Sequence, residues 1–205
     1  MKKFVLLIVV FIAAGLLAYK LLSDKPVGPQ SHDDRALRVS KNTPAFNIAF
    51  DSVLDNYFAL HDALVNWDTL KADQAAYALA AKTDSLPLRQ VRGDSGIILT
   101  ARSMAAALSG DAKGFSESGG FEGRRQTFNT VTDDLYNLLR TVQYDQAKIY
   151  HIRCPMAFKD SLEGFWLSNT PEIANPYLGN KHPVYKAKMV TCGEIIDSFP
   201  LPKKS

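Results

Sequence analysis

The stretch FNIAFDSVLDNYFALHDALVNW, residues 46–67, decides the fold, because its large apolar side chains recur at alternating intervals of four and three residues. This spacing places them along one side of an α-helix. The residues of this stripe are Phe46, Phe50, Val53, Tyr57, Leu60, Leu64 and Trp67. We therefore expect an amphipathic helix that buries one side.

Three further segments show helical spacing, and each has its own apolar stripe. Asp68 is the expected N-cap of the second helix, which Pro87 ends. The inward positions are Ala72, Ala75, Ala76 and Leu79 in the second helix, Ile97, Ala101, Met104 and Leu108 in the third, and Phe128, Val131, Leu135, Leu138 and Val142 in the fourth, which we expect to begin near Arg124. The glycine-rich residues 110–123 are expected to form a loop. Four such stripes are buried most simply against each other, which predicts a mainly α fold: a four-helix up-and-down bundle.

The pattern changes near Lys148. Residues 147–158, AKIYHIRCPMAF, alternate β-branched and aromatic side chains with others, which predicts a short strand. We expect residues 148–197 to form a small irregular or β cap on the bundle, so that residues 45–197 make a single domain. A small unit with little regular hydrogen bonding usually needs a covalent or metal staple.

The N-terminus carries an apolar run, residues 4–22, that follows Lys2 and Lys3. Two interpretations remain open: a signal peptide cleaved after small residues near residues 13–18, and an uncleaved membrane anchor. We favour the anchor because the run is long for a signal peptide. Both interpretations export the rest of the chain to an oxidising compartment. Residues 23–44 are polar, contain proline and lack periodicity, which is typical of a flexible spacer.

The composition argues against some functions. The net charge is +3, and several of the positive charges lie at the termini, so nothing indicates a basic surface for nucleic acid. The motifs of serine hydrolases, zinc proteases and phosphate-binding loops are absent from the sequence. We therefore expect a binding or structural protein and no enzyme.

Both cysteines of the chain lie in the predicted cap, and each has a methionine close by. Cys154 and Met156 are two residues apart and share one face of an extended strand. Met189 and Cys192 are three apart and converge in a turn. Thiolate and thioether sulfur are soft ligands, so a site made of these four residues would prefer Cu(I), with Ag(I) as an alternative.

A disulfide bond between the two cysteines is the alternative to a metal site. Exported proteins with two cysteines often join them, and a Cys154–Cys192 bond would close a loop of roughly 39 residues and contribute roughly 4 kcal/mol. The methionines would then be packing residues. His182, in a loop near Met189, is a possible accessory ligand. Trp166 is expected to cover the core of the cap, with cation–π contact to bound metal as a second possibility.

The sequence resembles a bacterial exported family of unknown function whose members occur alone or fused to the C-terminus of copper/silver-efflux periplasmic adaptor proteins. The resemblance covers about residues 45–196. It rests on CPMAF (154–158), WLS (166–168), EIANPYLG (172–179) and MVTCGE (189–194), and more weakly on YFALHDALVNWD (57–68) and RRQTFNTV (124–131). The positions that match the family motifs are Cys154, Met156, Trp166, Asn175, Pro176, Tyr177, Gly179, Met189 and Cys192.

The resemblance implies a helical domain with a role in heavy-metal handling. It implies a place on the periplasmic side of the inner membrane and metal-efflux components as partners. One difference lies in NKHPVYKAK, residues 180–188, which lengthens the link between Gly179 and Met189.

Overall fold

The computed structural model describes residues 41–158 and 162–200. The expected anchor, residues 4–22, and nearly all of the expected spacer, residues 23–44, lie outside the described residues and stay predictions. Within the described ranges, no helix is both long enough and apolar enough to cross a membrane.

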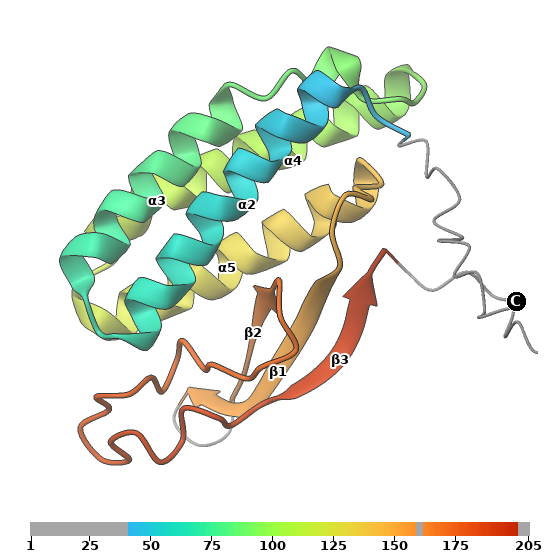
Figure 1. Cartoon of the computed structure of the whole chain (residues 1–205). Coiled ribbons are helices and arrows are strands. Elements are labelled where there is room, and N and C mark those ends of the chain that lie inside the picture. Colours follow the sequence, from blue (N-terminus) through green and yellow to red (C-terminus); the bar gives the residue numbers. More distant parts are fainter. Residues whose placement is uncertain (1–40, 159–161, 201–205) are drawn as a thin grey trace, which may run out of the picture. The chain divides into compact units, whose positions relative to one another are not determined.

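Four α-helices account for most of the described chain (Figure 1). They are α2 (Pro44–Val65), α3 (Thr69–Asp84), α4 (Ser95–Gly114) and α5 (Gly120–Thr141), with single 3₁₀ turns at Leu88–Gln90 and Phe115–Glu117. The expected N-cap is confirmed, because the Asp68 carboxylate accepts a hydrogen bond from the amide of Lys71 at 3.0 Å. Thr43 and Asp94 cap α2 and α4 in the same way.

The apolar stripes of these helices form the core, as the periodicity predicts. On α2, Phe46, Phe50, Val53, Tyr57, Leu60 and Leu64 are each 0% exposed, and the stripe of α5 is buried to the same degree. Burying one such side chain contributes about 1.5–3 kcal/mol, so the stripes are the main source of stability. Each helix packs against the next one in the chain, which confirms the mainly α, four-helix up-and-down fold.

One boundary prediction was wrong. Residues 110–123, expected as a loop, are largely helical: α4 continues to Gly114 and α5 begins at Gly120, before Arg124. The reason is that Ala112 and Phe115 extend the buried stripe, and packing outweighs the low helix propensity of glycine. The chain reverses at Gly119 and Gly120, whose φ angles of +74° and +55° suit glycine.

The cap contains a three-stranded antiparallel sheet with the order β2–β1–β3. Its strands are β1 (Ile149–Phe158), β2 (Leu162–Ser168) and β3 (Glu194–Phe199). The expected strand at 147–158 is confirmed, whereas β3 was not anticipated as a strand. In the register of β1 with β2, Ile152 faces Trp166 and Cys154 faces Gly164. The pairing shifts between Cys154 and Phe158, where Pro155 has no N–H to donate.

The sheet lies between α5 and the connection from β2 to β3, residues 169–193 (Figure 1). On one face, His151 of β1 stacks on Tyr136 of α5 with 4.2 Å between ring centroids. On the other, the Trp166 ring lies so close to Gly193 that a Cβ there would come within 2.6 Å of Cη2. The β2–β3 connection therefore covers the sheet face that carries Cys154.

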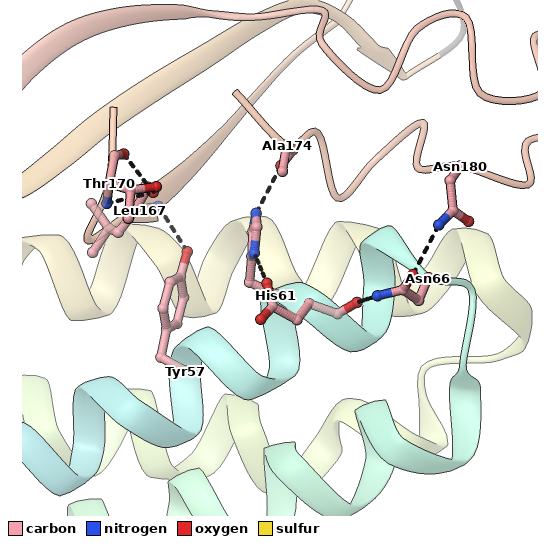
Figure 2. A network of polar contacts seen from close by, with 9 residues as sticks. Tyr57, His61, Asn66, Leu167, Thr170, Ala174 and Asn180 are labelled. Carbon is pink, nitrogen blue, oxygen red and sulfur yellow. Dashed lines mark hydrogen bonds and ion pairs between the residues drawn. The ribbon is translucent and has the colours of Figure 1, made fainter. Parts of the chain in front are cut away.

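Two side chains of α2 tie this cap to the bundle (Figure 2). The hydroxyl of Tyr57 accepts a hydrogen bond from the amide of Leu167 at 3.0 Å. His61 Nε2 donates to the carbonyl of Ala174 at 2.8 Å, while Nδ1 faces Asp62 Oδ1 at 2.9 Å. His61 is only 6% exposed, and its contact with Ala174 holds the segment EIANPYLG (172–179) against α2.

Candidate dithiol site

The structure brings the two cysteines together. Cys154 on β1 is fully buried and Cys192 is partly buried, and their sulfur atoms lie 3.4 Å apart although the residues are 38 positions apart in the sequence. Both are free thiols. The close approach comes from packing of the β2–β3 connection on the sheet, so it belongs to tertiary structure.

The two methionines lie on the same two segments as the cysteines. Met156 follows Cys154 by two residues on β1, but regular alternation is interrupted there, because the pairing of β1 with β2 shifts between Cys154 and Phe158. A Cβ at Gly164, the partner of Cys154, would lie 2.5 Å from the Cβ of Ala157, so the shared face of Cys154 and Met156 stays a prediction. Met189 and Cys192 form the expected turn, because the Cys192 amide donates to the Met189 carbonyl at 3.0 Å. Both methionine side chains are partly buried against the core. Within the described part of the chain, no group of three or more His, Cys, Asp and Glu residues is arranged to hold a metal ion.

Asn175 positions the Cys192 turn. It is fully buried, and its Nδ2 donates to the carbonyl of Cys192 at 2.7 Å. Its Oδ1 accepts from the amides of Tyr177 and Leu178 at 2.8 and 2.9 Å, and its own amide donates to Val190 at 2.7 Å. One amide side chain therefore closes the NPYLG turn and joins it to the segment that carries Cys192.

The remaining motif residues anchor the same turn. Pro176 is buried, and the fully buried Tyr177 donates from its hydroxyl to the carbonyl of Phe165 and contacts Asn129 Oδ1 at 3.0 Å. Asn129 was not singled out as a site residue in the sequence, although it lies in the RRQTFNTV segment of the family resemblance. Gly179 has a φ of +57°, and a Cβ there would lie 2.5 Å from the indole nitrogen of Trp67. These residues build the surroundings of the dithiol and hold it in place.

Trp166 and His182 differ in their relation to the cysteines. Trp166 is fully buried, forms an edge-to-face contact with Tyr177 at 6.2 Å and packs against Gly193, the residue after Cys192. His182 contacts the rings of Trp67 and Tyr185, and its Nδ1 faces the amides of Val184 and Tyr185 at 3.2 Å. Trp166 therefore lies beside the dithiol, whereas these contacts of His182 hold it against the end of α2.

Burial controls the protonation of Cys192. Desolvation raises the pKa of Cys192 to about 11, with a further contribution from its hydrogen bond to Cys154. The Cys192 thiol is therefore protonated at neutral pH and is a poor nucleophile in this state. A soft metal would have to displace the proton in order to bind.

The comparison with known protein families gives a match for the helical part of the chain only. Residues 53–147 match the model of the family described as "Protein of unknown function (DUF3347)". The match supports a domain-of-unknown-function family and ends before Cys154, so it includes none of the four sulfur residues. No curated protein and no solved structure matches the chain.

Proposed function

We propose that this protein is a membrane-tethered periplasmic module that binds Cu(I), or Ag(I) as a second soft ion, and has a binding role and no enzymatic one. Cys154 and Cys192 supply the charged ligands, and Met156 and Met189 supply thioethers. The single observation that carries the proposal is the 3.4 Å separation of the two free thiol sulfurs.

The chemistry of the donors supports a soft metal. Two thiolates and two thioethers suit Cu(I) and disfavour Mg, Ca and Mn, which prefer oxygen. The donors come from β1 and from a hydrogen-bonded turn, and the two cysteine sulfurs already lie 3.4 Å apart. The fully buried Trp166 packs beside the turn, against Gly193.

The resemblance to domains fused to copper/silver-efflux adaptors supports the same assignment and suggests efflux components as partners. The residues of that motif, Asn175 to Gly179, hold the Cys192 turn on the sheet. In this proposal they preorganise the site, and residues 4–22 keep it at the outer face of the inner membrane. Sequencing the N-terminus of membrane-fractionated protein tests the tether, and a soluble chain that begins near residues 16–20 would rule it out.

The decisive experiment is a Cu(I) titration of the reduced full chain in mild detergent against a competing chelator. We expect about one ion per chain, with binding that strengthens as pH rises because the Cys192 proton must leave.

Cys154→Ser and Cys192→Ser should each remove most of the binding. Met156→Leu and Met189→Leu preserve volume and should weaken it without unfolding the cap. Met104→Leu, a methionine of α4, is the matched control and should bind as the wild type does. Wild-type binding by both cap methionine variants would show that the thioethers are not ligands.

The same observation favours a second candidate function, a disulfide-stapled interaction domain of the cell envelope. Bond formation between Cys154 and Cys192 would fix the Cys192 turn to β1 and stabilise the domain by roughly 4 kcal/mol. Mass spectrometry of protein trapped with an alkylating agent in the cell distinguishes the two. Fully oxidised protein whose reduced form binds no Cu(I) would establish the staple, whereas alkylated or metal-bound thiols would support the metal site.

A further inference from the structure

Arg125, in the second turn of α5, is an unusual residue that the dithiol site does not use. It is 4% exposed, and its Nε and Nη2 are buried without a hydrogen-bond partner among the residues that the structure describes. Burial lowers the pKa of its guanidinium to about 10, still well above neutral, so the side chain keeps its charge. An unpaired buried cation is costly and calls for an anion.

The preceding residue shows what the missing contact would be. Arg124 donates from Nε to Asp73 Oδ1 at 2.8 Å and from Nη2 to Asp73 Oδ2 at 2.9 Å, which is a bidentate pair with a carboxylate. The same two nitrogens of Arg125 have no hydrogen-bond partner in residues 41–158 and 162–200. Glu122 acts on Arg125 through its charge, but it is exposed on the helix surface.

Aromatic rings hold the Arg125 guanidinium in place. Its Cζ lies 4.3 Å from the ring centroids of both Trp67 and Phe121, and these rings stack on each other at 4.1 Å. Trp67 has a φ of 59°, an uncommon value for a bulky residue, and its indole N–H donates to the carbonyl of Leu178 at 3.2 Å. The cation–π contacts offset only part of the cost of burial, and they leave the Nε–Nη2 edge unused.

The guanidinium lies beside the positive end of α5. Because Phe121 is the second residue of this 22-residue helix, the contact between Arg125 and the Phe121 ring directs the side chain toward the first turn. The N-cap, Gly119, makes no side-chain hydrogen bond to the amides of that turn. The helix dipole and the unpaired guanidinium therefore both favour a negative charge at this place.

We propose that Arg125 and the first turn of α5 form a binding site for a small carboxylate anion. The Nε–Nη2 edge matches two carboxylate oxygens, as Asp73 demonstrates for Arg124. A small ligand fits better than a protein partner because the donors are buried. Access would require movement of the segment Leu178–His182, which contacts Trp67 through the Leu178 carbonyl and the His182 ring. The proposal is independent of the dithiol site.

Thermal unfolding of the full chain in detergent tests the proposal, with acetate and succinate as probes and chloride at equal ionic strength as the reference. The wild-type melting temperature should rise with carboxylate concentration and saturate. Arg125→Met should abolish this response and should be at least as stable as the wild type in chloride, because it removes an unpaired buried charge. Arg125→Lys keeps the charge but loses the two parallel N–H donors of the guanidinium, and should weaken the carboxylate affinity at least tenfold.

Arg124→Met is the matched control. It should lower the melting temperature, because it leaves Asp73 unpaired, and should keep the carboxylate response. The NMR signals of the arginine Nε–H groups give a test that needs no variant. The Nε–H signal of Arg125 should shift when the carboxylate is titrated, whereas the signal of Arg124, which is bound to Asp73, should stay in place. Equal shifts of the melting temperature in wild type and Arg125→Met, or no carboxylate effect beyond chloride, would overturn the proposal.

Discussion

Replacing Asn175 by alanine should destabilise the cap strongly. The side chain makes three hydrogen bonds of 2.7–2.9 Å at a fully buried position. The variant leaves the amides of Tyr177 and Leu178 and the carbonyl of Cys192 without their partners. At about 1–2 kcal/mol for each unpaired group, the loss is about 3–6 kcal/mol. Total stabilities are typically about 5–15 kcal/mol, so this is a large fraction.

Urea unfolding followed by circular dichroism measures this loss. With a slope of about 2 kcal/mol per molar urea, the midpoint should fall by about 1.5–3 M. Asn180→Ala is the control, because Asn180 lies in the same connection and its side-chain amide donates a single hydrogen bond, to Asn66 Oδ1 at 2.8 Å. Its effect should stay within about 1 kcal/mol. Equal effects of the two substitutions would refute the view that Asn175 organises the cysteine turn.

Two further predictions concern single positions. Gly179→Ala should destabilise the protein by more than about 1–2 kcal/mol, because φ is +57° and the new Cβ would meet the Trp67 indole. The control Gly110→Ala, in open space on α4, should stabilise it by about 0.5–1 kcal/mol. Urea midpoints compare the two variants, and an unchanged midpoint for Gly179→Ala would contradict the reasoning. Burial, and then the hydrogen bond to Asp111, raises the pKa of Asp134 to about 6. The protonated Asp134 therefore contributes stability that is fully present below the unfolded pKa near 3.8 and is lost as the pH rises through 6. Melting temperatures from pH 5 to 7.5 should therefore fall less steeply in Asp134→Asn than in the wild type, and parallel curves would rule out this role.

Local sequence patterns were sufficient to predict the bundle. The four–three stripe of α2, the Asp68 cap and the alternation in β1 each depend on residues close in the chain, and the structure confirms them. The same reasoning failed at residues 110–123, because burial of Phe115 outweighs the glycines around it. It also missed β3, which is a strand because it pairs with β1.

The candidate sites were accessible from sequence to different degrees. The residue types and spacing of Cys154, Met156, Met189 and Cys192 were visible at once, and the turn from Met189 to Cys192 follows from local hydrogen bonding. The meeting of the two cysteines was only a hypothesis before the fold was known. Arg125 lies in the RRQTFNTV segment of the family resemblance, but its burial was not expected, because an arginine on an amphipathic helix normally lies in solvent.

The sequence by itself determined which segments become helices and strands, because hydrophobic periodicity and capping act over a few residues. Tertiary structure decided which of these segments and side chains come into contact. It placed the Cys154 and Cys192 sulfurs 3.4 Å apart, and it buried the Arg125 guanidinium against the stacked rings of Trp67 and Phe121. Such contacts join residues far apart in the chain, and they form only when the buried faces of complete elements pack against each other.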